Sequence, residues 1–272
     1  MWLHTRWCIT GHGICKWSLS QLGVDEYHTG RVCIPQYLVK MIVAIHQPNF
    51  LPWLCYFNKL LRSDLFVLFD DVQFPRGKTF VNRVQIKTQQ GLNWITVPVA
   101  DRGDLALIKD TAIASNGSWK RKLLRTLEVN YAKAPYLKRY LPALKEIIEA
   151  ATDKLCPLNC ALLAWSVQEL GGRTQFVYSS DLCKNQPLLN GKEKIEYLLK
   201  ATGATVYISG SGAGSRRYLE EEWFRNEGIQ LQWQQFCHPQ YPQLHGEFAE
   251  QLSIIDLIFN CGPRARSFVL SQ

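Results

Sequence analysis

Short apolar runs alternate with amphipathic segments along most of the chain. Residues 41–46 (MIVAIH) and 65–69 (LFVLF) are almost continuously apolar, as strands covered on both faces of a sheet are. Residues 53–62 lie between them and have helical spacing. Strand, helix and strand within about 30 residues predict a βαβ unit, so we expect the two strands to be parallel neighbours.

The remaining pattern continues the α/β order. It predicts strands at 83–87, 94–99, 176–179, 205–209 and 231–235, and helices at 118–129, 136–150, 157–170, 192–201, 216–226 and 252–259. A turn at Gln90-Gly91 joins the first two of these strands. We therefore expect one α/β domain over residues 41–272, with a mostly parallel sheet, covering helices and an inserted helical segment over 118–170.

Residues 1–40 differ from the rest of the chain. They hold three of the nine tryptophans and three of the nine cysteines, and no helical or strand period runs through them. Met41 is the second of two methionines and opens the first clear strand. We interpret it as the natural start and residues 1–40 as a non-native or disordered extension. The alternative is a metal module of Cys8, His12, Cys15 and His28, whose spacing matches no zinc pattern.

Composition and charge indicate a globular protein of the cytoplasm. Hydrophobic residues make up 47% and charged residues 20% of the 272 positions, and no apolar run reaches the roughly 18–20 residues that span a bilayer. The six cysteines after Met41 are scattered, which favours free thiols. The net charge of +8 is spread out rather than gathered in a stripe with aromatic residues. It favours a small anionic ligand as partner over nucleic acid, and an effect on solubility alone is the alternative.

The first candidate site follows the first predicted strand. His46, Gln47 and Asn49 belong to a polar loop at its carboxyl end, where open α/β sheets bind ligands. Asp70 and Asp71 end the next strand. Because adjacent parallel strands lie about 4.8 Å apart, we expect one shared crevice. There His46 and the aspartates would do acid/base work, and the nearby carboxylates would raise the imidazole pKa. The alternatives are a packed histidine and a capped turn.

Basic residues follow this site closely along the chain. Arg76, Asn82 and Arg83 lie just after the second strand. An arginine binds a phosphate in bidentate geometry, so we expect this segment to help hold an anionic substrate. A solvated basic loop is the alternative.

Two later segments add candidate binding residues. Gly210, Gly212 and Arg216 belong to SGSGAGSRR, which joins a strand to a helix and can bring backbone N–H groups close to a phosphate. The Walker A pattern is absent, and a flexible turn is the alternative. Tyr241 and His245 belong to a polar and aromatic segment near the C-terminus. We expect no metal site, and the cofactor stays unknown.

Several of these segments together resemble the WbqC family. They are IHQPNFLPWLCYFNKLLRSDLFVLFDDVQF (45–74), NRVQIKTQQGLNWITVPV (82–99), WKRKLLRTLEVNYAKAPY (119–136), GATVYISGSGA (203–213) and PQYPQLHGEFAEQLSIIDLIFNCG (239–262). The resemblance covers about 41–270, and HQPNFLPW is specific to the family. Cys55 stands where the family usually has Gly, and Val84 where it often has Asn.

The resemblance implies a bacterial cytoplasmic protein, often encoded with enzymes of O-antigen and other surface polysaccharides. It supplies no reaction. A fainter likeness exists to nucleotidyltransferase-type folds, although Asn49-Phe50-Leu51-Pro52 stands where those enzymes have HxGH. We expect an enzyme of surface-polysaccharide biosynthesis, a transferase acting on a nucleotide-linked or amino sugar. A non-catalytic nucleotide-sugar-binding or scaffold protein is the alternative.

A chain that begins at Met41 is expected to fold with an unchanged melting temperature, because the pattern of a packed domain starts there. Thermal denaturation of the full and shortened chains checks this. Loss of solubility, or a melting temperature several degrees lower, would show that residues 1–40 belong to the fold.

Overall fold

The computed structural model describes residues 6–10, 13–17, 40–77, 79–100, 106–114 and 118–271. Strands β1 (Arg6–Thr10) and β2 (Gly13–Trp17) form an antiparallel hairpin. The rest of the predicted extension lies outside the described residues. His12 and His28 of the alternative metal module are among these.

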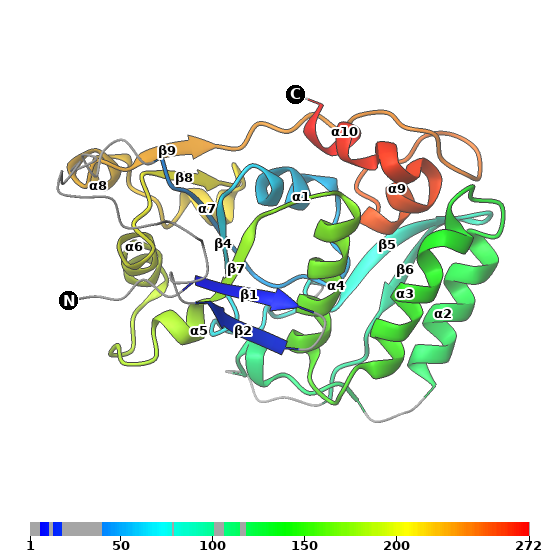
Figure 1. Ribbon diagram of the computed structural model, residues 1–272, viewed down its shortest axis with the longest axis horizontal. Coiled ribbons are helices and arrows are strands. Elements are labelled where there is room, and N and C mark those ends of the chain that lie inside the picture. Colours follow the sequence, from blue (N-terminus) through cyan, green and yellow to red (C-terminus); the bar gives the residue numbers. More distant parts are fainter. Residues whose placement is uncertain are drawn as a thin grey trace, which may run out of the picture.

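A parallel five-stranded sheet forms the centre of the fold (Figure 1). In spatial order its strands are β7 (Gln175–Tyr178), β4 (Leu65–Leu68), β3 (Ile42–His46), β8 (Val206–Ser209) and β9 (Gln230–Trp233). All four pairings are parallel, which confirms the expected pairing of β3 with β4. If the five strands are numbered by their order along the chain, their spatial order across the sheet is 3-2-1-4-5. This is the doubly wound arrangement, and its winding reverses between β3 and β8.

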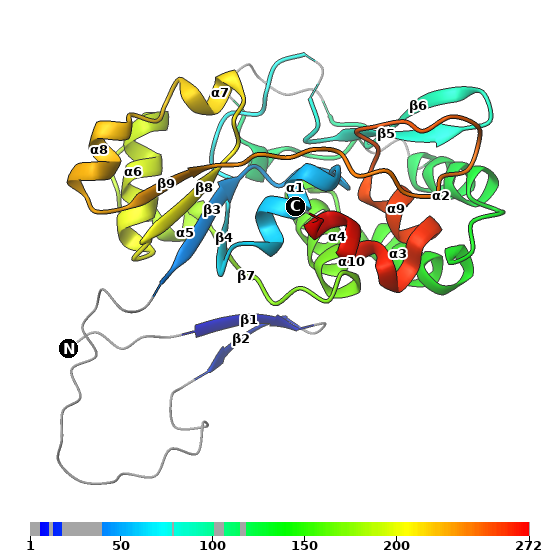
Figure 2. The ribbon, with the colours of Figure 1, turned by 90° about the horizontal axis from the view of Figure 1, so that it is seen from above.

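Helices cover both faces of this sheet (Figure 2). Helices α1 (Leu54–Leu61) and α4 (Leu155–Glu169) lie on one face. Helices α6 (Gly191–Ala201) and α8 (Glu221–Asn226) lie on the other. The expected fold class is therefore confirmed.

Strand side chains alternate between two hydrophobic cores. Ala44 and Phe66 face the larger core, whereas Val43, Ile45 and Val67 face the smaller one under α6 and α8. Because both faces of β3 and β4 are buried, neither strand carries a polar position before its end.

The predicted helical segment consists of α2 (Trp119–Asn130), α3 (Leu137–Ala150) and α4. It shares the larger core with the antiparallel strands β5 (Arg83–Thr88) and β6 (Gly91–Thr96) and with the C-terminal helices α9 (Ile254–Cys261) and α10 (Ala265–Leu270). These elements lie side by side in Figures 1 and 2.

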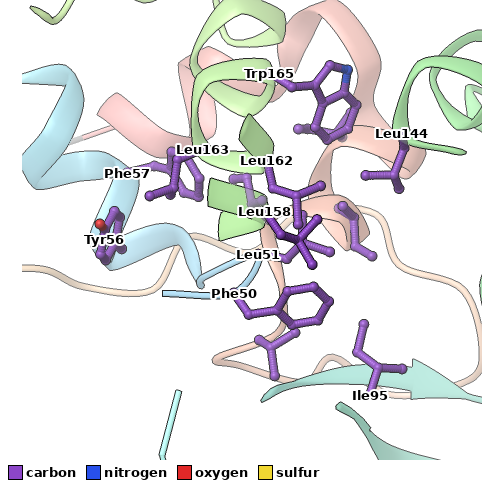
Figure 3. Close-up of a cluster of buried hydrophobic side chains, with 14 of the residues drawn as sticks. Phe50, Leu51, Tyr56, Phe57, Ile95, Leu144, Leu158, Leu162, Leu163 and Trp165 are labelled. Atoms are coloured by element: carbon purple, nitrogen blue, oxygen red, sulfur yellow. The ribbon is translucent and has the colours of Figure 1, made fainter. Parts of the chain in front are cut away.

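The loop that follows β3 is anchored in this core. Phe50 and Leu51 are fully buried and lie against Leu158 and Leu162 of α4 (Figure 3). Leu51 adopts a positive φ of 41°, which is strained for a side chain with a Cβ. Burying each of these two side chains stabilises the folded state by about 2–3 kcal/mol. This burial holds the strained backbone of Leu51 in place.

Two elements differ most from the sequence prediction. Of the expected helix 216–226, residues 221–226 form α8 and Arg216 ends the preceding short helix α7 (Ala213–Arg216), and Leu219 between the two helices packs into the smaller core. Strand β6 begins at Gly91, directly after the turn, rather than at residue 94. The short elements α5 (Ser179–Leu182), η3 (Ile108–Asp110) and η4 (Gly262–Arg264) have no periodic signal in the sequence.

A buried carboxylate joins the C-terminal segment to α2 and α9. Asp256 is fully buried and accepts hydrogen bonds from the hydroxyl groups of Tyr131 (2.8 Å) and Tyr241 (3.0 Å). Burial raises its pKa to about 6, against smaller opposing effects of these hydrogen bonds. The folded state therefore binds this proton more tightly than the unfolded state.

The contribution of Asp256 to stability should consequently decrease with pH. It is fully present below the unfolded pKa near 4 and is lost as the pH rises to about 6. Asn at position 256 cannot ionise, so the Asp256→Asn variant does not lose this stability as the pH rises. The difference in free energy of unfolding, variant minus wild type, should therefore increase across this window by on the order of 2 kcal/mol. Urea denaturation of both proteins at pH 4, 5, 6 and 7 measures this. Parallel pH curves would contradict the assignment.

Candidate functional site

A cavity of about 790 Å³ opens where the winding of the sheet reverses, at the carboxyl ends of β3 and β8. We call it the switch-point cavity. Strand β3 contributes His46, α1 contributes Cys55 and Lys59, and the loop after β8 contributes Gly210 and Gly212. Doubly wound folds bind their ligands at this place, since the crossovers on either side leave it open.

His46 presents a neutral imidazole to the cavity. Its Nδ1 lies 3.2 Å from the carbonyl oxygen of Gln47, which can only accept a hydrogen bond, so Nδ1 carries the proton. This leaves the Nε2 lone pair as an acceptor. Tyr56 packs edge-on against the ring at 4.7 Å and also donates to the Gln47 carbonyl, at 3.0 Å. The strand end and α1 together fix the ring.

The imidazole pKa is lowered, contrary to the expectation from the sequence. Burial is the largest cause, and the nearby Lys59 ammonium adds to it, bringing the pKa of His46 to about 3. The expected effect required a carboxylate beside the ring, and no carboxylate contributes to the shift. At neutral pH the His46 imidazole is therefore neutral. It can accept a hydrogen bond or a proton, but it is not protonated and cannot act as a general acid.

Lys59 is a cavity residue that the sequence interpretation missed. Its residue exposure is 3%, and its Nζ makes one long hydrogen bond, 3.4 Å, to the carbonyl oxygen of Ile45. Burial lowers its pKa to about 8. The sequence held a signal, because Lys59 is the one charged residue in the apolar helix LCYFNKLL.

Cys55 and Gln234 close the cavity beside Lys59. The Cys55 thiol donates to Oε1 of Gln234 at 3.4 Å, and Nε2 of Gln234 donates to the Cys55 carbonyl at 2.8 Å and to Asn58 at 2.9 Å. Burial raises the pKa of the Cys55 thiol, so it is neutral at pH 7. The six cysteines from Cys55 to Cys261 are free thiols.

The glycines of the loop after β8 are not required by the fold. Gly210, Gly212 and Gly214 do not adopt positive φ. An added Cβ would meet nothing within 4 Å at Gly212 or Gly214, and only a hydroxyl at 3.7 Å at Gly210. Glycine without a conformational or packing reason is typical of backbone that a ligand approaches closely.

An aromatic surface lies at the edge of the cavity. Trp53 and Phe80 line it and stack at 5.3 Å with an angle of 22° between their planes. Phe80 also contacts Trp94 at 5.9 Å, and the guanidinium of Arg83 lies 4.2 Å over the Trp94 ring. Asn82 donates to the carbonyl of Val97 at 2.9 Å. Arg83 is the first residue of β5 and Asn82 precedes it, and neither side chain lines the cavity.

Asp70 and Asp71 are held away from His46. Asp70 accepts hydrogen bonds from Ser179 (3.0 Å) and Ser180 (2.7 Å), and Asp71 pairs with Lys194 at 2.9 Å. Neither lines the switch-point cavity. The reason is the strand order: β4 and β8 flank β3 on opposite sides, and the cavity opens on the β8 side. The structure therefore does not form the expected shared crevice, and catalytic roles for the two aspartates stay predictions.

The other predicted residues lie outside the cavity as well. Asn49 is buried, and its Oδ1 has no hydrogen-bond partner. Arg76 is exposed. Arg216 stacks over Trp233 at 4.7 Å and donates to the Ser211 carbonyl at 3.1 Å, so it supports the glycine loop from outside.

Tyr241 and His245 have structural contacts. The Tyr241 hydroxyl binds Asp256, and Nε2 of His245 lies 2.7 Å from the carbonyl oxygen of Asn130 at the end of α2. Both help to fasten the C-terminal segment to α2 and α9. Neither side chain lines the switch-point cavity.

A second hollow of about 850 Å³ lies between the outer faces of α2 and α3. Its walls are long surface side chains such as Lys120, Arg125 and Lys145, and it is remote from the strand ends. Within the described ranges, no three His, Cys, Asp or Glu side chains are grouped to hold a metal, and no helix is long and apolar enough to cross a bilayer.

Comparison with known proteins gives a family and no activity. An uncharacterized protein of Mycobacterium tuberculosis, Rv1507c, is 36% identical over 231 residues, which cover 84% of this chain and 96% of that protein. No solved structure matches. Residues 47–268 match the WbqC-like protein family, from the loop after β3 into the last helix. The chain therefore belongs to the WbqC-like protein family.

Proposed function

We propose that this protein is a transferase that binds a nucleotide-linked sugar in the switch-point cavity. The observation that supports this best is the cavity itself. It combines a proton-accepting imidazole, a buried cation and a loop open to close approach at the reversal point of a doubly wound sheet. The biosynthesis of surface polysaccharides as its pathway is inferred from the family resemblance alone.

In such a transfer, His46 is the candidate base. The acceptor hydroxyl or amine attacks the sugar carbon, the nucleotide phosphate leaves with the bonding electrons, and the acceptor proton passes to Nε2 of His46. With a pKa of about 3 the free imidazole is a weak base. An anionic ligand close to Lys59 would oppose the charge that depresses this pKa and would make the imidazole more basic when substrate is bound.

The alternative is a nucleotide-sugar-binding protein without catalysis. The low pKa of His46 and the position of Asp70 and Asp71 favour this alternative, since both aspartates have partners outside the cavity that the imidazole lines. Kinetics separates the two functions.

His46→Ala should lower turnover of a sugar nucleotide by about 10²–10⁴-fold and change its affinity little. Asp71→Asn is the comparison. It removes an ion pair outside the cavity and should lower the melting temperature while turnover is retained. Steady-state kinetics with a panel of sugar nucleotides, together with calorimetric dissociation constants, measures both variants.

A loss of affinity in His46→Ala with no turnover in wild type would instead support the binding protein. A large loss of turnover in folded Asp71→Asn would restore a catalytic role to that residue.

Gly212→Ala should weaken sugar-nucleotide binding without destabilising the fold. The methyl group meets no protein atom and the backbone has an ordinary φ, so stability should be unchanged or slightly higher. Gly262→Ala is the matched control, because its φ is 53° and its Cβ would lie 2.6 Å from the Tyr136 ring. It should lower the melting temperature strongly. Equal affinity in Gly212→Ala and wild type would remove this loop from the site.

A further inference from the structure

Lys59 and Lys87 are buried in the described part of the chain, and Lys194 is partly buried with 12% of its side chain exposed; the three lysines differ in their partners. Lys87 donates to Gln243 (3.2 Å), to the Gly246 carbonyl (3.1 Å) and to the Glu247 carbonyl. Lys194 pairs with the carboxylate of Asp71 at 2.9 Å and also binds its carbonyl at 3.0 Å. Lys59 has the single 3.4 Å contact with the Ile45 carbonyl.

Among the residues that the structure describes, no group around Lys59 supplies a counter-charge. His46 from β3 is neutral, and burial raises the pKa values of Cys55 and Tyr56 from α1, so both are neutral as well. On the cavity wall, burial lowers the pKa of His238. Glu250, the one carboxylate that lines the cavity, is exposed to solvent. An ammonium ion removed from water without a partner is costly, so its retention in a cavity needs a reason.

We infer that Lys59 binds a phosphate group of the ligand and that this anion is the counter-charge that the Lys59 ammonium lacks. The inference rests on the proposed function, which assigns the switch-point cavity as the ligand-binding site. It adds that Lys59 is the residue that contacts the phosphate group of the ligand. The glycine loop fits a phosphate because its backbone is accessible and carries no negative side chain. Lys59 acts on a phosphate as a point charge.

A phosphate at Lys59 makes binding depend on the protonation of this amine. With a pKa of about 8 in the free protein, Lys59 is mostly charged at pH 7 and about 3% charged at pH 9.5. The apparent affinity should therefore fall about thirtyfold between these values. His46, Tyr56 and His238 stay neutral over this range. Lys59 is thus the facing group whose charge is lost.

The test uses pyrophosphate as probe and calorimetric titration of the full chain at constant ionic strength, at pH 7 and 9.5. Pyrophosphate gains negative charge as the pH rises, so weaker binding at pH 9.5 cannot come from the probe. Lys59→Arg keeps its charge at both pH values and should bind with little pH dependence. Lys59→Met should lose binding at both. Lys200→Met, a surface control whose lysine is 54% exposed and pairs with Glu227, should behave as wild type.

Absence of pyrophosphate binding to wild type at pH 7 would overturn the inference, as would equal binding by folded Lys59→Met. Lys59→Met replaces a buried charge with an apolar chain, so it should fold. If Lys59→Met transfers sugar like wild type, the transferase proposal stands and the phosphate site falls. If pyrophosphate binding requires Lys59 but no sugar nucleotide is turned over, the phosphate site stands and the transferase proposal falls.

Discussion

The rest of the structure depends on the burial of β3 at the middle of a parallel sheet. With β4 on one side, β8 on the other and a helical layer on each face, its interior positions admit only apolar side chains. The first polar side chain of the strand is His46, at the point where the chain leaves the sheet. The segment that follows β3 then packs into the larger core through Phe50 and Leu51. This packing fixes the position of the start of α1 at Leu54.

Helix α1 serves both the core and the cavity. Leu54, Phe57 and Leu60 pack into the larger core, whereas Cys55 and Lys59, one turn apart, line the switch-point cavity. Packing of the apolar side keeps the helix in position against β3. The lysine is thereby held close to the strand end. Burial lowers the pKa values of both His46 and Lys59, and the lysine charge lowers that of His46 further. The electrostatics of the cavity are a consequence of how this helix packs.

Local patterns predicted the elements well, since periodicity reports which side of an element is buried. The segments around β3, α1, β4, α2 and α3 appear within a few residues of their predicted bounds. The prediction of the site was less complete. His46, Gly210 and Gly212 meet in one cavity, but Asp70 and Asp71 bind Ser179, Ser180 and Lys194, which follow more than 100 residues later in the chain. No short-range pattern reports such partners.

The sequence by itself determined the α/β class, the parallel pairing of β3 with β4 and the family, because each follows from contiguous segments. Only the tertiary structure decided which neighbour of β3 shares its cavity, since strand order depends on crossovers that join distant parts of the chain. It also decided the charge of the site. The pKa values of His46 and Lys59 are set by burial and by which groups lie near them, and Cys55 meets Gln234 across 179 residues. Desolvation is a property of the assembled fold and cannot be read from residue types alone.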